Sequence, residues 1–287
     1  MPRIAYVNGR YTPLAEAAVH VEDRGYQLAD AVYEVWSVFD GKLADAEGHF
    51  ARLKRSLGEL RIDEPMSREA LTVVLREVLR RNRIREGLLY LQVSRGVAPR
   101  DHAFPAHPAA PAVVVTAKPL NRPASEAKAA LGVSVVTTPE IRWGRCDIKT
   151  VGLLPNVLAR QAARERGAAE AWFVDDIGLV TEGASSNAWI IDRQGVLRTR
   201  DTNANILRGV TRLTLLDVIA KAGLKVEERA FTPEEAAEAQ EAFITGAGSL
   251  VLSVTHIDGR PIGGGAPGPV AKRLRSLYIE QARASAI

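Results

Sequence analysis

Short β-rich runs closed by turn residues, with few helical stretches between them, are the feature that most constrains what this chain can fold into. Residues 4–7 and 11–12 flank Asn8 and Gly9, a dipeptide that favours a tight β-hairpin. Residues 32–39 are rich in valine and aromatic residues and end at an Asp-Gly turn. Because strands follow one another so closely, with only occasional helices, we expect an α+β fold with mainly antiparallel or mixed sheets.

Periodic segments and one polar stretch predict two domains. Helical spacing predicts helices near residues 50–60, 71–79, 155–166 and 211–222 and from Pro269 onward, and Ser67 can cap the second of these. Strand character is found at 88–93, 112–117, 133–137, 171–174, 179–182, 187–191, 241–245 and 250–254. Two prolines in the polar stretch 118–125 are typical of a linker. We therefore expect an N-terminal α+β domain at 1–117, an interdomain linker at 118–126 and a C-terminal α+β domain at 127–287, which would carry Lys149.

Charge and composition exclude several classes of protein. The 38 basic residues are interspersed with 34 acidic ones, and only 6% of residues are aromatic, so the basic stripe of a nucleic-acid-binding protein is missing. The single cysteine, Cys146, allows no intrachain disulfide and is interpreted as a packing residue rather than a thiol nucleophile. No apolar run approaches the roughly 20 residues that span a bilayer. The first residues lack the apolar core of a signal peptide, so we expect a cytoplasmic protein.

Metal and nucleotide sites find no support in the motifs. The five histidines do not show the spacing of metal ligands, and we expect no metal. Residues 263–268 formally match G-x-G-x-x-G, but this segment does not close a strand within a βαβ unit and contains Pro267. The dinucleotide interpretation is therefore rejected.

Lys149 and Glu182 are candidates for cofactor chemistry. Lys149 precedes an expected helix, and Glu182 ends an expected strand further along the chain. A lysine amine can hold an aldehyde cofactor as a Schiff base, and a carboxylate can keep a pyridine nitrogen protonated. The alternative is that both are solvated surface charges, as most lysines and glutamates are.

Two further segments are candidates for binding anions. Val210 and Thr211 stand where a loop meets a helix N-terminus, which favours an anion, although Thr211 could be only an N-cap. Gly246 and Ala247 lie in a glycine-rich turn that could present backbone amides to the same anion.

The irregular loop at 95–105 carries two candidates for binding a carboxylate. Arg100 and His102 lie two residues apart in this loop and could converge on one carboxylate, with arginine supplying a planar pair of donors. The alternative is a solvated loop in which Asp101 is the counter-ion.

These segments together resemble the fold-type IV pyridoxal-phosphate-dependent aminotransferases. The resemblance extends along nearly the whole chain and is most specific at 147–149 and 182–189. The segments 22–26, 33–35 and 99–102 resemble the D-amino-acid branch of the family. Two positions depart from the family pattern: Ala29 and Ala31 stand where glycines are common, and the turn at 246–247 lacks the usual hydroxyl side chains.

The resemblance implies a role for each candidate. Lys149 would hold pyridoxal 5'-phosphate and move the proton at the substrate Cα, and Glu182 would pair with the pyridine nitrogen. The other cofactor contacts would be Leu207 against the ring and, at the phosphate, Arg52, Val210, Thr211, Gly246 and Ala247. The substrate carboxylate would be bound by Tyr33, Arg100 and His102. Because Arg100 and His102 would come from the neighbouring subunit, the resemblance implies a homodimer with shared active sites.

The function expected from these roles is transamination between D-amino acids and α-keto acids, for example D-alanine or D-glutamate with 2-oxoglutarate or pyruvate. Within the family, the alternatives are a branched-chain L-amino-acid aminotransferase, an (R)-amine transaminase and an aminodeoxychorismate lyase. The alternative from another class is a basic, non-catalytic anion-binding protein.

Overall fold

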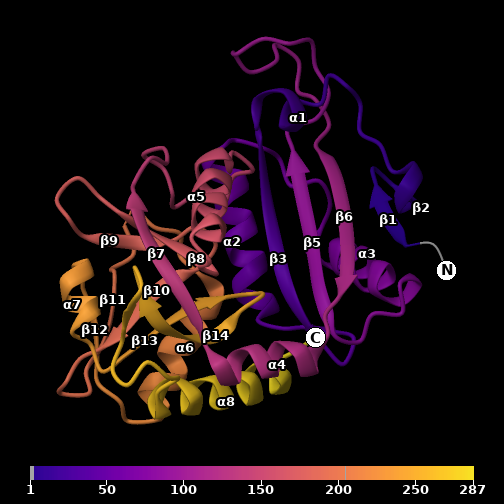
Figure 1. The fold of residues 1–287 in the computed structure, drawn as a ribbon. Helices are drawn as coiled ribbons and strands as arrows, with labels where there is room; N and C mark the ends of the chain where they lie inside the picture. Colours follow the sequence, from indigo (N-terminus) through magenta and orange to yellow (C-terminus); the bar gives the residue numbers. More distant parts are fainter. Residues whose placement is uncertain (1–2, 204) are drawn as a thin grey trace. The chain divides into compact units, whose positions relative to one another are not determined.

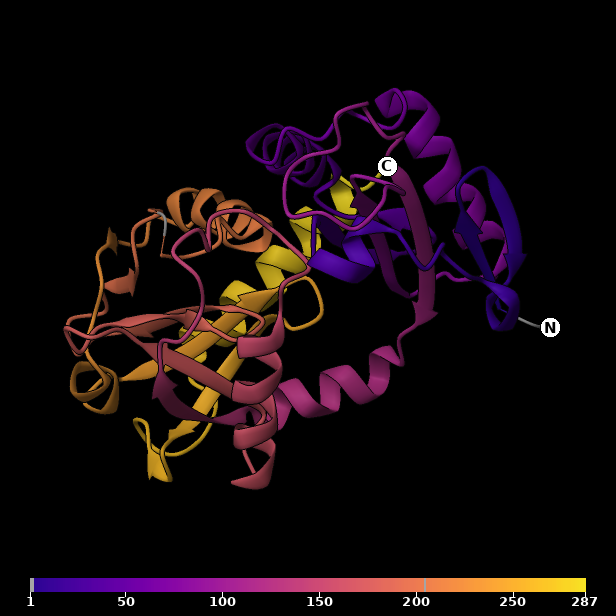
Figure 2. The ribbon, with the colours of Figure 1, turned by 90° about the horizontal axis from the view of Figure 1, so that it is seen from above.

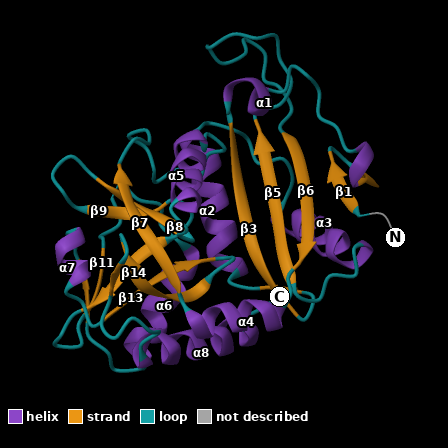
Figure 3. Ribbon diagram, viewed as in Figure 1, coloured by secondary structure: helices purple, strands orange, loops and turns teal. Residues whose placement is uncertain are grey.

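The chain forms two compact units. The structure, a computed structural model, describes residues 3–203 and 205–287. Unit 1 comprises Met1–Asn121, Ile148–Gly152 and Ser285–Ile287, and unit 2 comprises Arg122–Asp147 and Leu153–Ala284. Both units combine helices and strands, as the α+β prediction requires (Figure 3).

Unit 1 is built on a six-stranded sheet with the order β2-β1-β6-β5-β3-β4, in which neighbouring strands are antiparallel (Figure 1). Its strands are β1 (Ile4–Val7), β2 (Arg10–Pro13), β3 (Ala31–Phe39), β4 (Lys42–Leu43), β5 (Gly87–Ser94) and β6 (Ala112–Pro119). β3 and β5 pair along their length, with Tyr33 opposite Gln92. This pairing fixes which side chains of β3 share a face, because successive residues of a strand point to opposite sides.

Two amphipathic helices complete the core of unit 1. The helical segments of the unit are η1 (Leu14–Glu16), α1 (Arg24–Leu28), α2 (Ala46–Glu59) and α3 (Arg68–Arg81). Apolar residues of α2 and α3 belong to one buried cluster with Trp36 and other residues of the sheet. Ser67 caps α3 as predicted, since its hydroxyl accepts a hydrogen bond from the backbone N–H of Ala70 at 3.2 Å.

Unit 2 is built on a nine-stranded mixed sheet with the order β12-β11-β10-β13-β14-β7-β8-β9, and β15 pairs with β14. Its strands are β7 (Val133–Pro139), β8 (Glu170–Val174), β9 (Val180–Gly183), β10 (Asn187–Ile191), β11 (Leu197–Thr199), β12 (Val226–Glu228), β13 (Glu241–Gly246), β14 (Leu250–Ile257) and β15 (Arg260–Pro261). The pairs β11–β12, β14–β7 and β7–β8 are parallel. The helices are α4 (Arg122–Leu131), α5 (Leu154–Glu165), α6 (Val210–Lys221), α7 (Pro233–Ala237) and α8 (Pro269–Ala284). The yellow α8 runs along unit 2 next to β14 (Figure 2).

The predicted linker is not irregular throughout. Residues 118–126 contain the end of β6 and the first residues of α4, a helix that the sequence did not predict. Pro123 is the second residue of α4. Proline is tolerated there because the first N–H groups of a helix have no acceptor within the helix.

The segment around Lys149 groups with unit 1 and not with the C-terminal part of the chain, where the sequence prediction had put it. The backbone gives the reason. The carbonyl of Lys149 accepts a hydrogen bond from the N–H of Tyr33 at 3.0 Å, and the N–H of Val151 donates to the carbonyl of Ala31 at 3.2 Å. Ile148 is buried in the core of unit 1. Lys149 is thereby held against β3.

Candidate active site

Lys149 lies over an aromatic ring of unit 1. Its side-chain nitrogen is 4.1 Å from the centroid of the Tyr33 ring, a distance typical of a cation–π contact. Tyr33 stacks on Tyr90, with 5.6 Å between the ring centroids. Burial, followed by the neighbouring Tyr33, raises the pKa of Tyr90 to about 12, and its hydroxyl donates to Gln92 at 2.8 Å. The predicted lysine and the predicted substrate-binding tyrosine are therefore neighbours.

Arg52 is held by a buried carboxylate on β3. Its guanidinium donates to both oxygens of Glu34, through Nε at 2.8 Å and one terminal nitrogen at 2.7 Å. His49 Nδ1 is 2.7 Å from the same carboxylate. Burial alone would raise the pKa of Glu34, but the charge and hydrogen bonds of Arg52, together with His49, lower it to about 2. Glu34 is thus a carboxylate that fixes the guanidinium of Arg52.

The loop that follows β5 carries Arg100 and His102 on its exposed surface. Arg24 donates to the backbone carbonyl of Asp101 at 2.7 Å and to the Asp30 carboxylate at 2.8 Å. The Asp101 carboxylate accepts from the N–H of Ala103 at 3.2 Å and so stabilises a turn of the loop. The loop is therefore anchored at its backbone while both predicted carboxylate-binding side chains face solvent.

Ala29, one of the departures from the family pattern, has a left-handed backbone with a φ of 55°. It is the C-cap residue of α1. An L-residue in this region is strained by roughly 1–2 kcal/mol relative to glycine, which explains why glycine is common at such a position.

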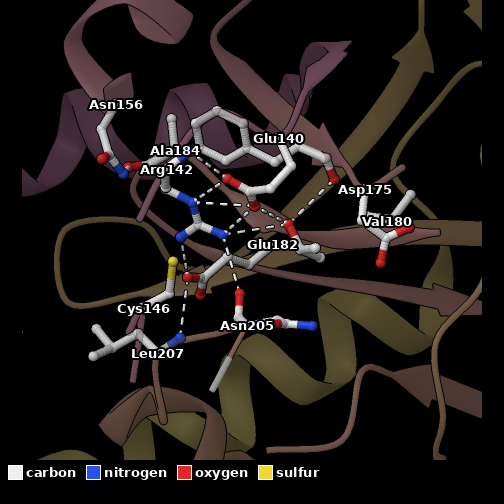
Figure 4. A network of polar contacts seen from close by, with 12 residues as sticks. Glu140, Arg142, Cys146, Asn156, Asp175, Val180, Glu182, Ala184, Asn205 and Leu207 are labelled. Atoms are coloured by element: carbon white, nitrogen blue, oxygen red, sulfur yellow. Dashed lines mark hydrogen bonds and ion pairs between the residues drawn. The ribbon is translucent and has the colours of Figure 1, made fainter. Parts of the chain in front are cut away.

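Glu182 is a buried carboxylate of unit 2 that accepts hydrogen bonds on both oxygens. One oxygen accepts from a terminal nitrogen of Arg142 at 2.5 Å and from the backbone N–H of Leu207 at 3.0 Å (Figure 4). The other accepts from Asn187 Nδ2 at 2.9 Å. Hydrogen bonds to the charged form favour that form, so this donor set holds Glu182 as an anion.

Leu207 leads directly to the N-terminus of α6. The N-cap residue is Gly209, which leaves the helix without a side-chain cap, so the alternative that Thr211 is the N-cap is wrong. A Cβ at position 209 would collide with Asn187 Oδ1, and only glycine fits there. Val210 and Thr211 are buried in the first turn. Uncapped amides at a helix N-terminus, with a hydroxyl beside them, favour an anion such as phosphate.

The second predicted anion-binding turn follows β13. Gly246 is the last residue of β13 and pairs with Leu250, and a Cβ at position 246 would lie 3.2 Å from the carbonyl of Ser185. Thr245 is fixed by the indole N–H of Trp189, which donates to its hydroxyl at 3.0 Å. Gly246 and Ala247 therefore stand at the end of a well-ordered strand.

The donor set of unit 2 fits pyridoxal phosphate. A carboxylate suited to a protonated ring nitrogen and a helix N-terminus suited to a phosphate are joined through Leu207, whose N–H binds Glu182. Within residues 3–203 and 205–287, no group of three acidic, histidine or cysteine side chains is placed to hold a metal ion. In the same residues, each helix is too short or too polar to span a bilayer.

Arg142 and Glu140 are residues of this site that the sequence did not reveal. Neither belongs to a recognisable motif, and the ion pair of Arg142 with Glu182 joins residues 40 positions apart in the chain. Burial raises the pKa of the Cys146 thiol to about 11, although the charge of Arg142 acts in the opposite direction. A thiol this weakly acidic is a poor nucleophile, which disfavours the alternative of a thiol nucleophile.

The chain belongs to the class IV aminotransferases: the model of the amino-transferase class IV family matches residues 31–257. Relatives named D-alanine aminotransferase match almost the whole chain. The protein from Bacillus licheniformis is 44% identical over 269 residues, covering 94% of this chain and 93% of the relative. The protein from Staphylococcus haemolyticus is 38% identical and covers 96% of this chain and 97% of the relative.

Solved structures agree on the fold. The branched-chain amino acid aminotransferase of Escherichia coli has a TM-score of 0.89 at 23% identity and covers 98% of this chain and 95% of its own. A second branched-chain amino acid aminotransferase, complexed with N-(5'-phosphopyridoxyl)-L-glutamate, has a TM-score of 0.85 at 27% identity, with 98% and 94% covered. The expected fold type IV and the resemblance to its aminotransferases are confirmed, and the non-catalytic alternative is excluded.

Proposed function

We propose that this chain transfers amino groups between D-amino acids and α-keto acids, with pyridoxal 5'-phosphate as cofactor. The observation that carries the proposal is the near full-length similarity to relatives named D-alanine aminotransferase. The branched-chain L-amino-acid alternative rests on solved structures that are only 23% and 27% identical to this chain. The D-amino-acid function is therefore preferred.

The bound cofactor supplies a protonated pyridine ring that withdraws electrons from the substrate Cα. Lys149 would hold the cofactor covalently, and its amine would move the proton at the substrate Cα as a general base. Its position over Tyr33 supports this role, since the contact keeps the amine at one place on β3. Glu182 keeps the proton on the ring nitrogen.

The remaining contacts divide between the ring, the phosphate and the substrate. Leu207 packs against the ring. The phosphate is bound by Arg52, Val210, Thr211, Gly246 and Ala247. Tyr33, Arg100 and His102 bind the substrate carboxylate. The uncapped N-terminus of α6 is the strongest support for the phosphate site, because the first amides of a helix need acceptors from outside it.

We infer that the enzyme is a homodimer in which Arg100 and His102 serve the neighbouring subunit. Large apolar side chains are exposed on this loop and on the segment next to it: Val19, Val21, Tyr26, Val97 and Phe104. Asp23 and Val97 form a β-bridge, so these segments lie side by side in unit 1. A second copy of the chain would cover such apolar surface.

A substrate panel tests the function. D- and L-amino acids are each assayed with 2-oxoglutarate and with pyruvate, and we expect D-alanine and D-glutamate to give the highest kcat/KM. A preference for L-leucine or L-valine would instead support the branched-chain alternative.

Mixing two inactive variants tests the shared site. Lys149→Ala and Arg100→Ala chains are combined under conditions of demonstrated subunit exchange, and we expect part of the activity to return, because some heterodimers then contain one intact site. Absence of recovery would mean that the loop serves its own subunit.

A further inference from the structure

The guanidinium of Arg142 lies between two carboxylates in unit 2 (Figure 4). It donates to Glu140 through Nε at 2.9 Å and a terminal nitrogen at 2.6 Å. Its other terminal nitrogen donates to Glu182 at 2.5 Å. The same side chain covers the ring of Phe173, with 4.6 Å from the guanidinium carbon to the ring centroid. The side chains of Arg142 and Glu182 are 7% and 6% exposed and that of Glu140 is 19% exposed, so most of the group is shielded from water.

The group joins one guanidinium to two carboxylates through short hydrogen bonds. Burial alone would lower the pKa of Arg142, but hydrogen bonding and the charges of Glu140 and Glu182 raise it above its ordinary value. Burial alone would raise the pKa of Glu140, but hydrogen bonds and charge from Arg142, together with the hydroxyl of Thr181, lower it. Two carboxylates and one guanidinium leave a single net negative charge. The nearby thiol of Cys146 is neutral, because its pKa is about 11.

We propose that Arg142 is a positioning residue and that the Glu140–Arg142–Glu182 group acts as one buried anion, matched to a single positive charge on the ring nitrogen of the cofactor. The inference rests on the proposed function and deepens it, because it assigns the control of ring protonation to Glu140 and Arg142, which would act through Glu182. Glu182 alone beside Arg142 would form a neutral pair. Glu140 supplies the charge that makes the group an anion.

The two outer residues of the group have opposite effects on Glu182. Arg142 stabilises the charged form of Glu182, and without it two neighbouring carboxylates would repel and one would take up a proton. Glu140 compensates Arg142, and without it the positive guanidinium would disfavour a second cation at the ring nitrogen. Only the loss of Glu140 removes negative charge from the group, so this loss should lower the protonation of the ring nitrogen. The loss of Arg142 should instead release Glu182 from its position.

The experiment uses pyridoxal phosphate labelled with nitrogen-15 in the ring. Wild type, Glu140→Gln and Arg142→Lys are reconstituted with it, and the nitrogen-15 chemical shift is measured across neutral and alkaline pH. Glu126→Gln is the matched control, because Glu126 also binds an arginine of unit 2 with both oxygens, Arg275 at 3.1 and 2.7 Å. Circular dichroism verifies that each variant is folded.

We expect the wild type and Glu126→Gln to show a protonated ring nitrogen at neutral pH. In Glu140→Gln the pKa of that nitrogen should fall by about one unit or more, as for the loss of one nearby opposite charge. Arg142→Lys keeps the charge but not the planar pair of donors, so it should retain ring protonation better than Glu140→Gln while binding the cofactor more weakly. Binding is measured separately, by fluorescence titration of the apoprotein.

The inference is overturned if the wild type binds the cofactor with a protonated ring and Glu140→Gln behaves identically. In that case the proposed function stands and only the role of the outer residues is lost. If the wild type does not bind the cofactor at all, both fail. Should Arg142→Lys not fold, the comparison of Glu140→Gln with Glu126→Gln decides alone.

Discussion

Each unit buries an arginine against a carboxylate, but the two clusters differ in net charge. In unit 1, Glu34 holds Arg52, and His49 completes the group. Burial lowers the pKa of His49, and its contact with Glu34 only partly opposes this. The one carboxylate of this cluster is thus matched by the one guanidinium of Arg52. In unit 2, Arg142 faces two carboxylates, and the cluster carries one negative charge.

The difference in net charge agrees with the ligand group that each cluster is proposed to bind, which is an anion for Arg52 and a protonated ring nitrogen for Glu182. A cluster with one carboxylate and one guanidinium orients the donors of Arg52 without adding much net attraction for an anion. An anionic cluster stabilises a cation, which a ring nitrogen becomes when it is protonated. The same pair of residue types thus serves as a rigid donor in one unit and as a counter-ion in the other, according to the number of carboxylates.

The largest expected effect tests whether unit 1 carries the reacting amine. Lys149→Ala should abolish steady-state transamination, because the amine over Tyr33 is then gone, while the fold persists. The measurements are the assay, circular dichroism and peptide mapping after borohydride reduction of the wild type. Cofactor fixed to a different lysine would contradict the assignment of Lys149.

The free energies of unfolding of two variants, one in each cluster, compare the clusters directly. Glu34→Gln should lower the free energy of unfolding by about 3–5 kcal/mol, because it leaves a buried arginine without its carboxylate. Glu140→Gln should cost less, about 1.5–3 kcal/mol, because Arg142 keeps Glu182. Urea denaturation of both variants measures the difference. Equal losses in the two variants would show that Glu182 does not stabilise the charge of Arg142 when Glu140 is replaced.

A smaller effect, on substrate binding, is expected for Arg100 in the exposed loop of unit 1. Arg100→Ala should reduce kcat/KM for D-amino acids by about one to two orders of magnitude, which corresponds to a charge-assisted hydrogen bond of about 1.5–3 kcal/mol. Activity toward (R)-amines, which lack a carboxylate, should fall much less. His107→Ala, a change in a neighbouring exposed residue, is the control. A uniform loss for both substrate classes would exclude a carboxylate-binding role.

The last expected effect concerns stability in acid. The pKa of Glu34 in the folded chain is about 2, below its ordinary value of 4.5, so its contribution is complete above the ordinary value and is lost as pH falls toward about 2. Wild type should therefore lose more stability than Glu34→Gln between about pH 5 and about pH 2. Urea denaturation at several acid pH values checks this. Parallel losses would mean that Glu34 contributes little to the acid transition.

Local patterns predicted most of the elements. The apolar stripe at 71–79 and the Ser67 cap predicted α3, and the valine-rich run at 32–39 lies within β3. The prediction failed at α4, where proline in a first helical turn was interpreted as a linker. The roles of Arg52, Arg100 and His102 stay predictions, because they concern ligands and a partner subunit.

Periodicity and turn residues, which are properties of neighbouring residues, indicated most of the elements from the sequence by itself. Resemblance of its motifs to a known family indicated the family and the roles of the candidate lysine and glutamate. Only the tertiary structure decided that Lys149 pairs with β3 and that Arg142 lies between Glu140 and Glu182. The pairing of β7 with β8 and of β8 with β9 brings Arg142 and Glu182 together across 40 residues of chain. Such contacts depend on strand order and register, so the three side chains form one cluster only when the sheet has formed.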